Sequence, residues 1–161
     1  MRCSRITKTF SLWSNMILFE LHSNPVPQKQ TRFYRFGDSI RTYDPCSKEK
    51  EQIQWQIKAY APEKPLDCPL KLDLTFYLPI PKSTSGTRKR QMINHVILPV
   101  KKPDIDNLAY LITNAMKKIV YNDDSQIVDL CIHKRYGNEP KTVVKVIPIF
   151  NLEQTRADVC D

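Results

Sequence analysis

The sequence has 161 residues and a formal net charge of +8, from 25 Lys and Arg against 17 Asp and Glu. This length suits one domain, and a hydrophobic content of 41% is too high for a disordered chain. No apolar run is long enough to span a bilayer, so we do not expect an integral membrane protein. The basic excess favours a polyanionic partner without identifying it.

The ends of the chain differ in composition from its middle. We interpret residues 1–15 as an N-terminal extension that is either disordered or upstream of the true start, residues 16–150 as the domain, and residues 151–161 as a polar tail. The five cysteines are odd in number and show no C-x-x-C spacing, so neither a disulfide framework nor a zinc site is expected. Reduced thiols indicate a cytoplasmic protein.

Hydrophobic periodicity gives the elements in chain order. It predicts a strand at 17–23, a hairpin of 33–36 and 39–43, a helix at 44–61 and a strict strand at 70–78. After an irregular segment at 82–103, it predicts a helix at 108–119 and strands at 128–133 and 142–149. This order favours an α+β domain with a mixed sheet and two main helices packed on one face.

Aromatic residues alternate in the predicted hairpin. Tyr34, Phe36 and Tyr43 can stack on opened nucleobases, as aromatic side chains of single-strand-binding proteins do. Alternating aromatics in a hairpin more often reflect packing within a sheet, and we expect packing here.

Four aspartates fall in two turns at opposite ends of the second predicted helix. Asp104 and Asp106 precede it, and alternate positions of an extended stretch point to one side. Asp123 and Asp124 follow it, at the start of a strand. If the two pairs converge, their oxygens suit Mg²⁺ or Mn²⁺ rather than zinc, facing a phosphodiester.

A purely structural interpretation of these aspartates also stands. Asp106 is a good helix N-cap, and Asp123 and Asp124 suit a turn. The segment 82–103 favours the metal interpretation, because it holds six Lys and Arg and no acid and leads directly to Asp104.

These motifs resemble the RusA family of Holliday-junction resolvases. The segment 102–108 reads KPDIDNL and the segment 123–127 reads DDSQI, which match the family pattern K-P-D-x-D-N-x-x-K, a helix and D-D-x-Q-[IV]. The flanking segments 24–29 (NPVPQK) and 78–82 (LPIPK) extend the resemblance to about residues 16–149.

The resemblance implies a homodimeric endonuclease that cuts four-way DNA junctions in recombination and repair. It implies Mg²⁺ or Mn²⁺, no organic cofactor, no membrane and a nucleoid-associated location. The essential acids correspond to Asp104, Asp106 and Asp124, with Asp123 as a further metal ligand.

One departure from the family lies close to these acids. The family lysine is replaced by Tyr110, one turn after Asp106, and a phenol carries no positive charge. Asn114 replaces an acid that relatives often carry. Lys102 or Lys134 is a candidate substitute for the missing ammonium.

The candidate phosphate-binding residues are basic and spread along the chain. Each of them also has a simpler interpretation as solvated surface charge. The candidates are Lys29, Arg32, Arg88, Lys89, Arg90, Lys101, Lys102 and Lys134.

Two other functions remain open. A junction-binding protein that has lost catalysis keeps the basic surface and needs no metal, with Tyr110 marking the loss. An RNA-binding α+β module is a third interpretation, although the sequence lacks an aromatic RNP motif.

Overall fold

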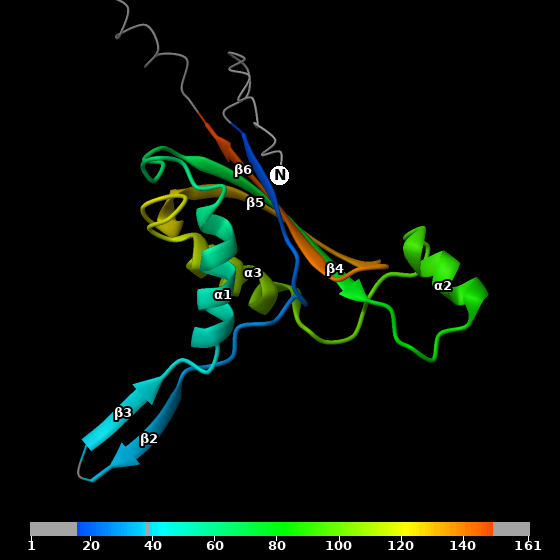
Figure 1. Cartoon of the computed structure of the whole chain (residues 1–161), viewed down its shortest axis with the longest axis horizontal. Helices are drawn as coiled ribbons and strands as arrows, with labels where there is room; N and C mark the ends of the chain where they lie inside the picture. The colour runs from blue at the N-terminus through cyan, green and yellow to red at the C-terminus, as the bar shows by residue number, and fades with distance from the viewer. Residues whose placement is uncertain (1–15, 38, 150–161) are drawn as a thin grey trace, which may run out of the picture.

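The computed structural model describes residues 16–37 and 39–149 (Figure 1). The predicted extension 1–15 and tail 151–161 lie outside these residues. Within the described residues, the chain forms an α+β domain with a four-stranded sheet, a separate two-stranded hairpin and three helices. The elements are β1 (Ile17–Leu21), β2 (Arg32–Phe36), β3 (Ser39–Tyr43), α1 (Ser47–Lys58), β4 (Leu70–Pro79), α2 (Gly86–Ile93), α3 (Ile105–Met116), a short 3₁₀ turn (Asp124–Gln126), β5 (Ile127–Gly137) and β6 (Lys141–Pro148).

The main sheet is mixed, as predicted. Its strand order is β1-β6-β4-β5. Strand β6 runs antiparallel to both β1 and β4, whereas β4 and β5 are parallel. Alternate residues of β4 from Leu70 to Leu78 are buried, so one face of this strand forms the centre of the core.

Helices α1 and α3 cover that buried face. Ile53 and Ile57 of α1 share one core cluster with β4 and with the apolar stripe of α3, which includes Leu108 and Leu111. The predicted packing of two main helices on one face is therefore confirmed. Only their ends differ, because α1 begins at Ser47 and α3 at Ile105.

The connection from β4 to β5 determines the direction of α3. Parallel neighbours cannot be joined by a tight turn, so the chain must return along the sheet before β5 can begin. Helix α3 makes this return, starting after the end of β4, and the segment 117–126 with its 3₁₀ turn connects it to β5 (Figure 1). The two ends of α3 therefore lie at different ends of the sheet.

The basic segment 82–103 is not irregular throughout. It contains helix α2, which lies beyond one end of the sheet (Figure 1). Met92 is the only buried residue of this helix. Without an apolar stripe there was no helical periodicity to detect, so the sequence interpretation of this segment as a loop was wrong.

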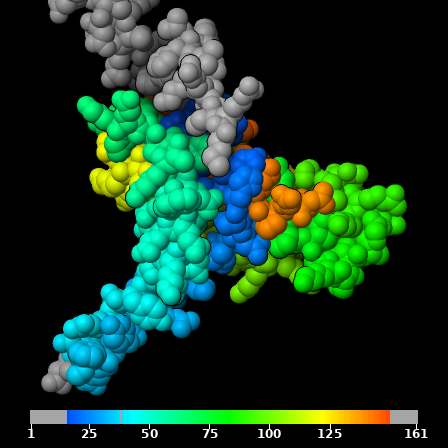
Figure 2. Space-filling model, in the orientation of Figure 1, coloured from blue at the N-terminus to red at the C-terminus, as the bar shows by residue number. Residues whose placement is uncertain are grey.

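The hairpin of β2 and β3 projects away from the body of the protein (Figure 2). All ten strand residues are exposed, and the two strands pair only with each other. The aromatic residues contact neighbours within the hairpin, with ring centroids of Tyr34 and Tyr43 6.0 Å apart. The expected packing is thus limited to the hairpin and leaves these side chains open to solvent.

Candidate functional site

Asp104 and Asp106 lie together at the start of α3. Asp104 occupies the N-cap position with an extended backbone, and its side chain makes no capping hydrogen bond. Asp106 lies in the first helical turn, so the interpretation of Asp106 as the N-cap was wrong. Both residues are exposed. Their carboxylates are not used to end the helix and can accept an external cation.

Asp123 and Asp124 lie beyond the other end of α3, beside a lysine that the sequence analysis did not single out. The Lys117 ammonium lies 2.9 Å from Asp123 Oδ2 and 2.9 Å from Asp124 Oδ1. Asp123 also accepts a hydrogen bond from the Ser125 amide at 3.1 Å. Its own amide donates to Gln126 Oε1 at 2.8 Å, which completes a capping box. Asp123 therefore caps the 3₁₀ turn, and both aspartates also pair with the charge of Lys117.

The ion pair changes the proton affinity of its members. The Lys117 ammonium is the main cause that holds the pKa of Asp123 well below its usual range, and hydrogen bonds from Ser125 are the second cause. Hydrogen bonds to Asp124 and Asp123 raise the pKa of Lys117. Asp123 is consequently ionised near neutral pH, the form of a carboxyl group that binds a metal.

The two acid pairs do not converge within one chain. A helix of 12 residues is about 18 Å long, and it stands between them. Within residues 16–37 and 39–149, no group of three or more His, Cys, Asp and Glu side chains could hold a metal ion. The convergence that the sequence analysis considered is therefore not seen within the described residues of one chain, because α3 is the return connection between two parallel strands.

A groove beside Asp104 gathers the flanking motifs that are distant in sequence. Its walls come from the segment 24–28 after β1, from the end of β4, and from the segment 99–104 with Lys101 and Lys102. Asn107 of α3 and Tyr136 of β5 complete it. Two of the predicted phosphate-binding lysines thus lie in the same groove as Asp104.

A second groove lies next to the first and shares Gln28 and Asn107 with it. Tyr110 and Asn114 line this groove from α3, opposite Lys29 and Lys50. Tyr110, the departure from the family pattern, is 57% exposed and lines this groove. Lys50 was not singled out from the sequence, because a lysine on a polar helix face is ordinarily solvated.

Lys134 holds the loop that leads to Asp104. Its Nζ atom donates to the carbonyl oxygens of Lys101 at 3.0 Å and Pro103 at 2.9 Å. Two of its three N–H donors are therefore used inside the protein. Lys134 is therefore better placed to orient the loop 101–103 than to contact a phosphate.

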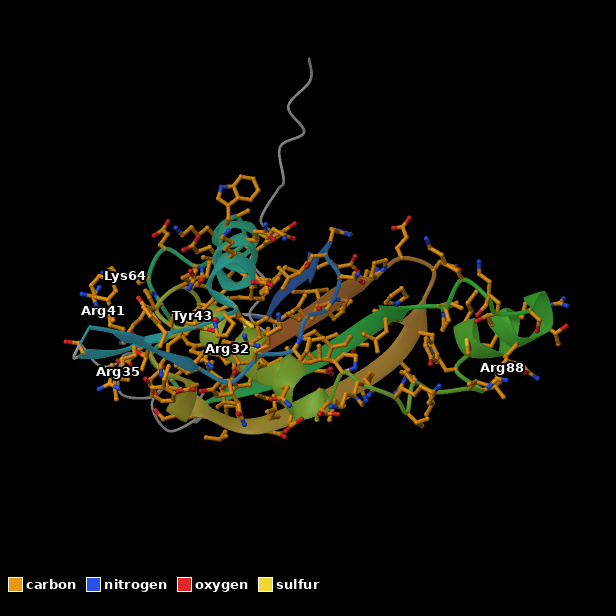
Figure 3. All side chains as sticks on the ribbon, turned by 90° about the horizontal axis from the view of Figure 1, so that it is seen from below. Arg32, Arg35, Arg41, Tyr43, Lys64 and Arg88 are labelled. Atoms are coloured by element: carbon orange, nitrogen blue, oxygen red, sulfur yellow. The ribbon has the colours of Figure 1, made fainter. Side chains whose placement is uncertain are left out.

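The remaining predicted phosphate-binding residues lie far from one another. Figure 3 shows Arg32 at the base of the hairpin and Arg88 on α2, well apart on the molecule. Lys89 and Arg90 accompany Arg88 on α2, and all four side chains are exposed. These predicted phosphate-binding residues thus lie on two separate parts of the molecule, the base of the hairpin and α2.

The residues at the start of α3 fit a hard divalent cation. Mg²⁺ binds through carboxylate oxygens and completes its shell with waters and substrate phosphates, so the two carboxylates beside a lysine-lined groove can supply part of its ligand set. Asp104 and Asp106 supply oxygen only, which favours Mg²⁺ or Mn²⁺ over zinc.

The geometry defines a class of α+β protein in which a pair of exposed carboxylates stands at a helix start beside a basic groove. The model of the family described as endodeoxyribonuclease RusA matches residues 22–147. The chain belongs to the RusA family, as the sequence motifs indicated.

Two relatives support this assignment. The uncharacterized protein YqaN of Bacillus subtilis (strain 168) is 30% identical over 134 residues, which cover 81% of this chain and 94% of the relative. The crossover junction endodeoxyribonuclease rusA of Lactococcus phage r1t is 28% identical over 116 residues, which cover 68% of this chain and 79% of the relative.

Two further observations concern the part of the chain that the structure describes. None of its helices is long and apolar enough to cross a membrane. Its cysteines, Cys46, Cys68 and Cys131, are unpaired, as predicted for reduced thiols.

Proposed function

We propose that the protein is a Mg²⁺- or Mn²⁺-dependent endonuclease that acts as a homodimer on branched DNA, with four-way junctions as its substrate. The observation that supports this most strongly is the placement of Asp104 and Asp106. Their carboxylates are exposed, take no part in capping, and stand beside a groove lined by Lys101 and Lys102. Family membership and the phage relative named as a crossover junction endodeoxyribonuclease support the same function.

Asp104 and Asp106 hold the cation in this proposal. When bound, a divalent cation supplies charge neutralisation at a phosphate and an activated water. The amides at the start of α3 and the positive end of its dipole attract the phosphate. Lys101, Lys102 and Lys29 contact the flanking phosphates, and Lys134 keeps the loop 101–103 in place.

A second copy of the chain supplies the other acid pair. Asp123 and Asp124 lie too far from Asp104 in one chain to share an ion with it. In a symmetric dimer, each site combines Asp104 and Asp106 of one protomer with Asp124 of its partner, and Asp123 stands beside it. Lys117 balances the charge of the second pair in the separate chain.

A junction-binding protein with weak or lost catalysis is the second candidate. The observation that favours it is Tyr110, which presents a neutral phenol to the groove. Lys29 and Lys50 line the same groove, so positive charge is available there from other elements. We therefore favour the enzyme.

The deciding experiment uses an end-labelled four-way junction with Mg²⁺, with Mn²⁺ and with EDTA. We expect paired nicks only with metal, and no nicks from Asp104→Asn, which still binds because a lost negative charge reduces repulsion of phosphate. Asp73→Asn on the opposite face of β4 is the matched control and cuts normally. Tight binding without cleavage supports the binding protein, and preference for single-stranded RNA over both DNA forms supports the third interpretation.

A further inference from the structure

The hairpin of β2 and β3 has two different faces. Its register pairs Arg32 with Tyr43 and Tyr34 with Arg41, and strand side chains alternate between faces. One face therefore presents two guanidinium groups and three aromatic rings. We name it the aromatic–arginine face, and it consists of Arg32, Tyr34, Phe36, Arg41 and Tyr43.

The side chains of this face support one another while staying open to solvent. The Arg41 guanidinium lies 4.9 Å from the centre of the Phe36 ring, and Tyr34 and Tyr43 meet edge to face. Phe36 is 64% exposed, and Tyr34 and Tyr43 are each 45% exposed. Clustered apolar surface of this kind marks an interaction site, because leaving it in water is unfavourable.

The hairpin begins and ends at the candidate site. The segment 28–31 leads into β2 and Asp44 follows β3, and both line the groove that contains Asn107 and Tyr110. Five-residue strands extend about 17 Å from that groove. This length corresponds to about five nucleotide steps of 3.4 Å, so DNA held at α3 can reach the whole hairpin.

We propose that the aromatic–arginine face stacks on unpaired bases next to the branch point of the DNA bound at Asp104 and Asp106, with its arginines on the adjoining phosphates. This inference rests on the proposed function and adds to it the surface that recognises the branch point, the aromatic–arginine face. Every base has a π-face, so stacking on Tyr34, Phe36 and Tyr43 is independent of DNA sequence, as reading a branch requires.

The charge of the hairpin favours nucleic acid over a second copy of the chain as its partner. Residues 32–43 carry three arginines against one aspartate. Two such faces brought together repel each other, whereas phosphates attract both. The face is also outside the core, so its substitutions leave the folded body intact.

The first test measures fluorescence anisotropy without divalent metal, using a four-way junction and a linear duplex of equal length. We expect Phe36→Ala and Tyr34→Ala each to weaken junction binding roughly 5- to 150-fold, the range of base–aromatic stacking, and duplex binding by less than about 2-fold. Trp55→Ala, an exposed aromatic of α1, is the matched control and changes neither.

The second test places 5-iododeoxyuridine at the branch point and maps the photocrosslink. We expect crosslinks to Tyr34 or Phe36. If the wild type binds and cuts the junction but both variants bind it normally and crosslinks map elsewhere, the inference is overturned while the proposed function stands. If the wild type fails to cut but still crosslinks through the hairpin, the proposed function fails and base stacking stands. If both variants lose a dimer by sedimentation while base crosslinks are absent, the hairpin is a contact between copies and the inference is overturned.

Discussion

The separation of the two acid pairs predicts that two inactive variants restore activity in each other. Asp104→Asn removes one acid of the first pair and Asp124→Asn removes one acid of the second. The 12-residue helix α3, about 18 Å long, stands between these pairs, whereas oxygens that share one Mg²⁺ lie about 2 Å from it and about 4 Å or less from each other. Each variant alone therefore lacks any complete site.

A mixed dimer that contains one chain of each variant differs from either variant alone in the acids at its two sites. If sites form between protomers, one site carries both substitutions and the other carries neither. Random pairing of equal amounts gives half mixed dimers, so about a quarter of all sites are intact in a two-fold symmetric assembly. Each intact site stands alone in its dimer, so the mixed dimer nicks one strand and does not make paired cuts.

The assay is single-strand nicking of an end-labelled junction by mixed dimers, purified through a different affinity tag on each chain. The matched control pairs Asp104→Asn with Asp106→Asn, which affect the same half of the site and leave no intact site in the mixed dimer. Recovery in the first pair and not in the control is expected. No recovery in either pair, or full activity of Asp124→Asn alone, would refute the reasoning.

Four further predictions concern single residues. Tyr110→Lys raises the cleavage rate about tenfold or more, because an ammonium stabilises charge on the phosphate, whereas Tyr110→Phe does not; equal rates for both would assign that task to another cation. Lys134→Met lowers the single-turnover rate without changing junction affinity, because the loop before Asp104 loses its two hydrogen bonds; a loss of affinity would instead indicate phosphate contact. Tyr121→Phe lowers the free energy of unfolding in urea by about 1–2 kcal/mol, since the buried hydroxyl donates to a backbone carbonyl of α3 at 2.8 Å, and no change would contradict that bond. The pKa of Asp123 is depressed in the folded protein, so its ion pair with Lys117 stabilises the fold above the unfolded pKa of Asp123, about 4, and this stabilisation is lost as the pH falls through the lower folded pKa. In urea titrations, the stability advantage over Asp123→Asn, which keeps a capping oxygen, should shrink between about pH 5 and pH 2. A difference that stays constant with pH would contradict the ion pair.

The sequence predicted the body of the fold well because alternation and helical spacing report burial directly. Leu70 to Leu78 alternate on β4, and Leu108 to Met116 form the buried stripe of α3. Helix α2 lacked this signal, since Met92 is its only buried residue. Local pattern likewise could not show that the hairpin stands outside the core.

The candidate site was predicted in its residues and not in its arrangement. The motif placed Asp104 and Asp106 at a helix start, where the structure has them. Their distance from Asp123 and Asp124 depends on the parallel pairing of β4 with β5, which is a long-range property. Lys117 was missed for a related reason, because its partners lie six and seven residues further along, beyond the end of its helix.

The return connection through α3 makes the proposed nuclease sensitive to concentration. In the proposed dimer, one chain carries both halves of the acid set but holds them beyond opposite ends of α3, so it would not complete a site by itself. Dilution below the dissociation constant of the dimer would switch off incision without unfolding the protein, and rising abundance would restore it. Assembly on the two arms of a branched molecule then becomes the step that permits cutting, which protects linear DNA from a stray single copy.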